Sequence, residues 1–206
     1  MSEETAPGAM IDPPTQAPPT AMAGASLPAL VMVSTPIGNL QDLSDRARST
    51  LSGVNAILCE DTRISAVLLR AHGISAKCVA LHEHNESAAI PRLVAAMQQG
   101  ERYALISDAG TPLVSDPGYR LVRAVIEAGL PVSGVPGANA AVLALTLSGL
   151  PPQPFLFTGF LPPKPGPRRS AFAGLRGAEL AGLSATHIFY EAPHRPVSYT
   201  HLTLPT

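Results

Sequence analysis

Five short apolar segments alternate with helical patterns along residues 29–147, and this alternation most constrains the fold. The apolar segments are 29–34, 56–59, 77–81, 104–106 and 131–135. Helical patterns follow them at about 44–51, 64–72, 87–99, 119–128 and 140–147. Strands that alternate with helices at such short spacing predict a parallel α/β sheet with helices on its faces. No apolar run approaches the ~18 to 20 residues that a membrane span requires.

Residues 104–119 form the most informative stretch. An apolar run breaks into small and polar residues, and the chain then continues with Asp116 and Pro117. Asp is a favoured helix N-cap and Pro is favoured at the first helical position, so we expect a helix to begin there. A strand, a tight loop and a capped helix can bring main-chain groups close to a ligand. A well-capped connection without a ligand is the alternative.

The first 28 residues differ from the rest of the chain. They contain Glu3, Glu4, Asp12 and six prolines but no Lys or Arg, so we predict a disordered tail and neither a secretory signal nor a transit peptide. Without them, 14 basic residues face 12 acidic ones, a balance that does not indicate a nucleic-acid binder. Cys59 and Cys78 match no metal or redox spacing, and we expect free thiols in a reducing, cytoplasmic compartment.

A loop of unusual composition follows each predicted strand. These loops are 35–40, 60–63, 82–86, 108–115 and 136–140. In a parallel sheet they lie at the edge where ligands bind. They are poor in Lys and Arg and rich in Pro, Gly, Ala and Thr, which favours main-chain contacts to a small, uncharged or zwitterionic cofactor over a nucleoside triphosphate. His82 and His84 lack a third ligand at a diagnostic spacing, so no metal site is predicted.

Five motifs in a fixed order carry a resemblance to a known family. They are Val33-Ser34-Thr35-Pro36-Ile37-Gly38-Asn39-Leu40, Glu60-Asp61-Thr62-Arg63, His82-Glu83-His84-Asn85-Glu86, Ser107-Asp108-Ala109-Gly110-Thr111-Pro112 with Ser115-Asp116-Pro117-Gly118-Tyr119, and Phe189-Tyr190-Glu191-Ala192-Pro193-His194-Arg195. From about residue 29 to residue 195 the chain resembles the small-subunit ribosomal RNA methyltransferases of the tetrapyrrole methylase superfamily. The resemblance implies two α/β domains, with S-adenosylmethionine bound in the cleft between them, and a homodimer. It also implies 2′-O-methylation of a cytidine in the decoding region of 16S rRNA.

The resemblance also implies which residues contact the cofactor. These are Pro36, Ala109, Gly110, Thr111, Val114, Asn139, Ala140 and Tyr190. One departure is 136–139, where members of the family often have a second proline soon after the glycine.

Methyl transfer to a sugar hydroxyl requires alignment and benefits from a base that receives the proton. The candidate bases are Asp108, Asp61, Glu191 and His194. We expect Asp108 at the cofactor end of the site and Glu60, Asp61 and Arg63 nearer the RNA. A capping or structural role for each of these residues is the alternative.

Composition changes after residue 150, and we predict an N-terminal methylase domain over 29–150 and the start of a second α/β domain over 151–195. Members of the family that the chain resembles continue beyond the His194-Arg195 pair with further strands and helices, and this resemblance implies that the second domain is incomplete. The dense basic cluster Lys164, Arg168 and Arg169 predicts contacts to RNA phosphates; a solvated loop is the alternative. Residues 196–206 resemble nothing in the family, and we interpret them as a break in the reading frame. Two other functions stay open: methylation of a tetrapyrrole, and binding of S-adenosylmethionine without catalysis.

Overall fold

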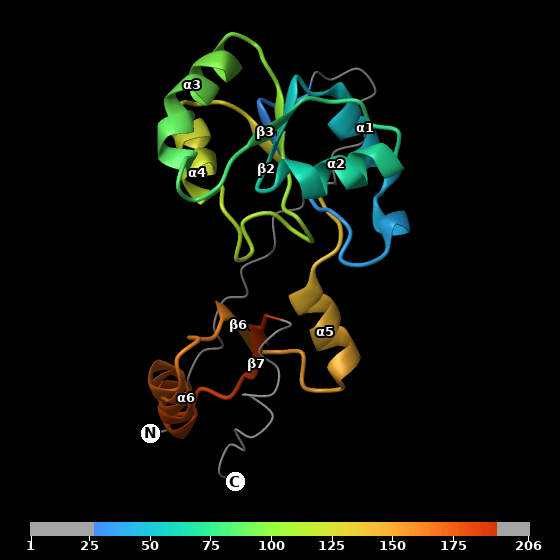
Figure 1. The fold of residues 1–206 in the computed structure, drawn as a ribbon. Helices are drawn as coiled ribbons and strands as arrows, with labels where there is room; N and C mark the ends of the chain where they lie inside the picture. The colour runs from blue at the N-terminus through green and yellow to red at the C-terminus, as the bar shows by residue number, and fades with distance from the viewer. Residues whose placement is uncertain (1–26, 193–206) are drawn as a thin grey trace, which may run out of the picture.

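The computed structural model describes residues 27–192 and shows two layered parts (Figure 1). The elements are β1 (Leu30–Val33), η1 (Leu40–Asp42), α1 (Asp45–Gly53), β2 (Ala56–Cys59), α2 (Thr62–Ala71), β3 (Cys78–Ala80), α3 (Glu86–Gln98), β4 (Tyr103–Leu105), α4 (Tyr119–Glu127), β5 (Val132–Val135), α5 (Ala140–Ser148), β6 (Phe155–Phe160), α6 (Pro165–Leu180) and β7 (Thr186–Tyr190). The predicted tail over 1–28 lies almost entirely outside the described residues, as do His194 and 196–206.

The first sheet has the strand order β3-β2-β4-β1-β5, and every neighbouring pair is parallel. This confirms the predicted α/β class with a mostly parallel N-terminal sheet. Helices α1 and α2 lie on one face of the sheet, and α3 and α4 lie on the other (Figure 1). Because the five strands are parallel, the loops that follow them all begin at the same edge of the sheet, where the carboxyl ends of the strands meet.

The sheet separates two hydrophobic cores. Leu51 of α1 and Leu69 of α2 pack with Ile57 on one face, whereas Leu93 of α3 and Leu121 of α4 pack with the opposite face. Cys59 is buried in the first core, and this burial raises the pKa of its thiol to about 11, as suits an unreactive structural cysteine. Strands buried on both faces explain the continuous apolar runs in the sequence.

Helix α4 begins at Tyr119, as the helical pattern over 119–128 predicts, and not at Asp116 and Pro117, as the N-cap pattern predicts. Asp116 and Pro117 do not cap it; the N-cap is Gly118, whose φ is +119°. Glu86 of α3 supplies the missing cap, since its Oε1 accepts a 2.9 Å hydrogen bond from the main-chain N–H of Leu121. A Cβ at Gly118 would lie 2.5 Å from Cδ2 of Leu105, so only glycine fits this approach to β4.

The second part of the chain contains β6 and β7, a parallel pair connected through α6. Helix α5 contacts β7 and lies beside this second sheet (Figure 1). The predicted domain boundary at residue 150 stays a prediction. Among residues 27–192, no helix has both the length and the apolar character to cross a membrane.

Candidate active site

The loops after β1 and β4 are held together at the carboxyl edge of the first sheet. The main-chain N–H of Thr35 donates to the carbonyl of Gly110 at 2.8 Å, and the N–H of Gly110 donates back at 3.1 Å. The buried hydroxyl of Thr35 donates to the carbonyl of Ser107 at 3.1 Å. This double connection fixes the first and central loops side by side.

Thr111 links the loop after β5 to the other two. Its hydroxyl donates to the carbonyl of Ala138 at 3.0 Å and accepts from the Ser34 hydroxyl at 3.3 Å. A Cβ at Gly137 would lie 2.9 Å from Cβ of Ser34, so the main chain of one loop packs directly against the other. Three of the predicted loops therefore converge on one place.

Where the loops converge, polar groups of two predicted cofactor residues already form hydrogen bonds within the protein. The carbonyl of Gly110 accepts from Thr35 and also from the Ser107 hydroxyl, and its N–H is bonded to Thr35. The side chain of Asn139 caps α5 by accepting from the N–H of Val142 at 3.1 Å. Gly110 and Asn139 consequently shape the loops through these groups.

The central loop contains a strained segment. Leu113 has a φ of +70° and Ser115 a φ of +69°, conformations that cost about 1–3 kcal/mol each outside glycine and gather at functional sites. A Cβ at Gly159 of β6 would lie 2.9 Å from Oγ of Ser115, so the second sheet touches this loop. The strained loop is thus the place where the two parts of the chain meet.

Tyr190 lies one strand away from that contact. It is paired with Phe160 across β6 and β7, and its ring packs edge-on against Phe157 and Phe160, with centroids 4.8 and 5.6 Å apart. Oε1 of Glu191, the next residue, accepts the N–H of Ala192 at 2.7 Å. Tyr190 of β7 therefore belongs to an aromatic cluster with two residues of β6, the strand that contains Gly159.

Among the predicted bases, Asp61 and Asp108 have different surroundings. Asp61 caps α2 and forms a 2.6 Å ion pair with Arg63, whose hydrogen bonds lower the pKa of Asp61 to about 2. Oδ1 of Asp108 accepts the N–H of Asp61 at 3.4 Å, and burial raises the pKa of Asp108. Asp61 is a weak base with a structural partner, whereas Asp108 holds a proton more readily.

Asp116 is the functional candidate that the sequence reasoning missed. It is half-buried at the end of the strained segment, and burial raises its pKa to about 6. The nearby carboxylates of Glu60 and Asp108 raise that pKa further, and the Ser107 side chain opposes them. The sequence contains a signal for it, the Ser-Asp pair that occurs at 107–108 and again at 115–116. The second pair was interpreted only as a helix N-cap.

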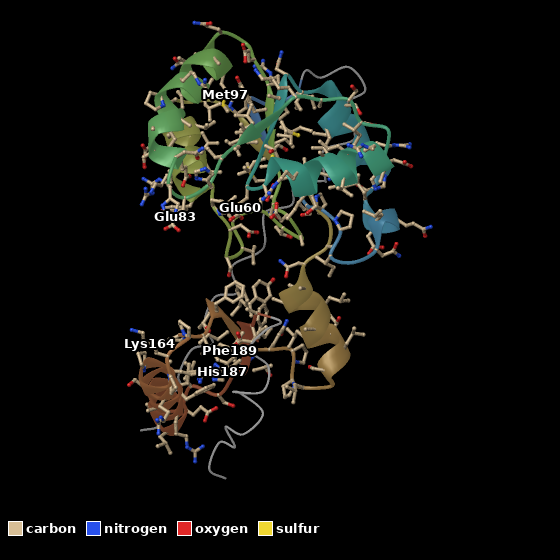
Figure 2. The ribbon with its side chains drawn as sticks, in the orientation of Figure 1. Glu60, Glu83, Met97, Lys164, His187 and Phe189 are labelled. Atoms are coloured by element: carbon tan, nitrogen blue, oxygen red, sulfur yellow. The ribbon has the colours of Figure 1, made fainter. Side chains whose placement is uncertain are left out.

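Two hollows border these carboxylates. One, of about 360 Å³, is lined by Glu60, Glu83, Asp116 and their neighbours. Glu60 and Glu83 both lie on the side of the first part that is turned towards the second (Figure 2). The other hollow, of about 300 Å³, places Pro36 and Asp108 beside apolar side chains of α2 such as Val67.

The predicted RNA contacts are only partly at the surface. Lys164 and Arg169 are exposed, whereas Arg168 is 4% exposed within α6, so its phosphate contact stays a prediction that the burial of its side chain does not favour. Arg63 is exposed yet paired with Asp61. His82 and His84 pack ring against ring, and among the described residues no three His, Cys, Asp or Glu side chains gather as a metal-binding group.

The fold and these loops define an α/β protein with a candidate ligand site at the carboxyl ends of parallel strands. A sequence model described as Tetrapyrrole (Corrin/Porphyrin) Methylases matches residues 29–203, and the chain belongs to this family. The predicted resemblance is thereby confirmed, and the match extends beyond residue 195, where we had placed its end.

Curated relatives make the likeness more specific. The chain is 52% identical over 168 residues to "Ribosomal RNA small subunit methyltransferase I" of Mesorhizobium japonicum, covering 82% of this chain and 55% of the relative. It is 47% identical over 166 residues to the protein of that name from Escherichia coli O157:H7, covering 81% and 56%. The chain thus spans little more than half the length of these relatives.

A solved structure supports the fold alone. A crystal structure of diphthine synthase superposes with a TM-score of 0.58 at 15% identity, covering 80% of this chain and 64% of that one.

Proposed function

We propose that the protein carrying this chain methylates the ribose 2′-hydroxyl of a cytidine in the decoding region of 16S rRNA. The observation that carries this proposal is the identity of about half of all residues, over four-fifths of the chain, to relatives named for methylation of small-subunit ribosomal RNA. The substrate favours a cytoplasmic location, where ribosomal subunits occur, and the protein is proposed to work as a homodimer.

The methyl donor of the tetrapyrrole methylase family is S-adenosylmethionine, which supplies a methyl group already activated by its sulfonium. The converging loops 35–40, 108–115 and 136–140 fit such a ligand, since Asp108 is the one charged residue among them. We assign its binding to Pro36, Ala109, Thr111, Val114, Ala140 and Tyr190, with Gly110 and Asn139 shaping the loops. Thr111 is central to this assignment because it joins all three loops.

Asp108 is the proposed proton acceptor. With the methyl donor bound, the ribose oxygen would receive the activated methyl group, and the Asp108 carboxylate would accept the hydroxyl proton. Asp108 lines the same hollow as Pro36, and its raised pKa suits a base that must hold a proton. Asp61 is disfavoured because Arg63 occupies its carboxylate. Asp116 is the second candidate, and Glu191 is a third.

Glu60, Arg63, Lys164 and Arg169 are proposed to contact the RNA from both parts of the chain. Lys164 and Arg169 are exposed at the start of α6, as phosphate contacts require.

The test is transfer of a radiolabelled methyl group to undermethylated small ribosomal subunits, with a porphyrinogen as the competing substrate. We expect labelled 2′-O-methylcytidine in the RNA and no labelled porphyrinogen. D108N should lower kcat by about 10²- to 10⁴-fold while S-adenosylhomocysteine still binds. Labelled porphyrinogen would favour a tetrapyrrole methylase, and S-adenosylhomocysteine binding without any transfer would favour a non-catalytic binder.

A further inference from the structure

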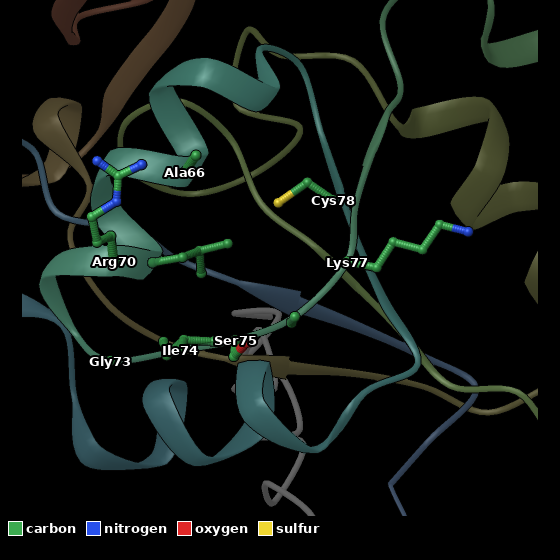
Figure 3. A pocket seen from close by; sticks show the side chains of 9 residues that line it. Ala66, Arg70, Gly73, Ile74, Ser75, Lys77 and Cys78 are labelled. Atoms are coloured by element: carbon green, nitrogen blue, oxygen red, sulfur yellow. The ribbon is translucent and has the colours of Figure 1, made fainter.

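Two hollows lie at the opposite edge of the first sheet. A hollow of about 700 Å³ opens between α2 and the segment that leads into β3, with Arg70 and Lys77 on its borders (Figure 3). A second hollow, of about 410 Å³, is lined by Lys77, Arg92, Glu101 and Tyr103. Lys77 borders both, so the two form one surface around the amino ends of β2, β3 and β4.

This amino-edge surface is positively charged. Arg70, Lys77 and Arg92 are all exposed, and none of them belongs to an ion pair among residues 27–192. Glu101 is the one carboxylate in the lining of the two hollows, and it accepts the hydroxyl of Tyr103. Burial and the Glu101 charge raise the pKa of Tyr103 to about 12, so the tyrosine keeps its proton and adds no negative charge.

The three cations come from different elements. Arg70 is in the last turn of α2, Lys77 precedes β3, and Arg92 is in α3. In Figure 3 the Lys77 side chain extends away from Arg70, so the charges are spread along the surface and do not converge on one point. A row of separated cations suits a polyanion with charges at intervals better than a single phosphate ion.

The carboxyl edge has the opposite charge. Four carboxylates and one cation line its 360 Å³ hollow, namely Glu60, Glu83, Glu86, Asp116 and Arg120, and the Asp108 carboxylate lies near Asp116. Arg63, a cation predicted to contact RNA there, is paired, and Arg168 is buried. A phosphate backbone is therefore repelled near the proposed chemistry and requires attraction from elsewhere on the molecule.

We infer that the amino-edge surface of Arg70, Lys77 and Arg92 binds the phosphate backbone of the RNA substrate at a distance from the methylated ribose. The inference rests on the proposed function for the identity of the RNA. Phosphate contacts position an RNA without reading its bases, so this surface supplies affinity and orientation while the carboxyl edge supplies chemistry.

The test compares two charge reversals of equal size in the whole protein. R70E/K77E/R92E reverses the surface, and R46E/R48E/R123E reverses three exposed arginines elsewhere. Affinity is measured by filter binding to a 16S rRNA transcript across a range of salt concentrations. We expect the first variant to bind at least ~10-fold more weakly near 100 mM salt, and the slope of log affinity against log salt to fall by about 2–3.

A neutral variant and two controls separate an effect of charge from a loss of folding. R70Q/K77Q/R92Q should give an intermediate loss, and both reversed variants should melt near the wild type and bind S-adenosylhomocysteine equally well. Equal RNA affinity and salt slope in the two reversed variants would overturn the inference. So would a loss confined to intact small subunits, because that result identifies a ribosomal protein as the partner. Wild-type protein that binds RNA without methylating it would remove the proposed function and leave the surface standing.

Discussion

Asp116 fits the local sequence pattern of a helix N-cap, but the structure does not use it as one. As an Asp before Pro it fits the N-cap pattern, yet the structure places it half-buried among Glu60, Asp108 and Ser107. Sequence patterns report local preference and do not report which carboxylates a fold brings together. Asp108 was found because it lies in the loop that follows a predicted strand, whereas the burial of Asp116 depends on the strained loop before it.

The raised pKa of Asp116 predicts a pH-dependent cost to folding. Its pKa is about 6 in the folded chain against an ordinary 3.8, so the cost is complete above pH 6 and disappears below about pH 4. D116N should therefore raise the free energy of unfolding by about 1–2 kcal/mol at pH 8, allowing for solvent screening, and change it little at pH 4. Urea unfolding at both pH values measures the difference.

Asp45 offers the matched control. Its carboxylate is exposed in a surface ion pair with Arg48, so D45N should have a small effect at either pH. A D116N effect that is the same at pH 4 and pH 8 would show that the carboxylate charge is not the cause.

At the scale of elements, the sequence predicted every strand of the first sheet and the helices between them within a few residues. Short apolar runs bounded by Gly, Pro and Asn are strong signals when both faces of a sheet are covered. The predicted N-cap at Asp116 was wrong, although the helical pattern over 119–128 was right, because tertiary contacts decide where α4 begins. Glu86 reaches from α3 to cap the helix, and the contact of Gly118 with Leu105 determines where the chain turns.

The close approach of Gly118 predicts a large penalty for a single methyl group. G118A should lower the free energy of unfolding by about 2–4 kcal/mol, since a Cβ would meet Leu105 at 2.5 Å and φ is +119°. Gly129 has a φ of +70° and open space where a Cβ would lie, so G129A should lower the free energy of unfolding by only about 1 kcal/mol. Denaturant midpoints of the two variants give the comparison, and equal costs would contradict the packing around α4.

Asn139 gives a second prediction for an element. Its side chain caps α5 through the N–H of Val142, so N139A should cost about 1 kcal/mol of stability, measured by urea unfolding. Asn39 caps only the short η1, and N39A is expected to cost less. Equal losses of stability in N39A and N139A would contradict the stabilisation of α5 by the side chain of Asn139.

At the scale of the whole molecule, the five-stranded first sheet has helices on both faces, whereas the second sheet has two strands among the described residues. Leu143 and Leu147 of α5 are 48% and 78% exposed, and β6 pairs only with β7 among the described residues. The change of composition after residue 150 predicted a second domain, and the resemblance to the family predicted that this domain is incomplete. It could not show that α5 would lie against β7, because the α5 sequence is apolar on all sides and marks no face.

The exposed face of α5 leads to a prediction about association. If copies of the chain dimerise through α5, L147E should weaken self-association at least ~10-fold in sedimentation velocity, because a buried charge is costly. Leu180 of α6 is 77% exposed and is the matched control, so L180E should sediment like the wild type. Equal behaviour of the two variants would place the dimer interface elsewhere.

The central claim is that loops joined through Thr111 bind the methyl donor. The most direct measurement is isothermal calorimetry of S-adenosylhomocysteine against wild type, T111V and T146V. Thr146 donates its hydroxyl only to its own helix, at Leu143, so T146V should leave binding unchanged. We predict one site per chain, with T111V binding about 10-fold more weakly because a buried polar link is lost. Absence of binding heat in the wild type, or equal affinity in the three proteins, would contradict the claim.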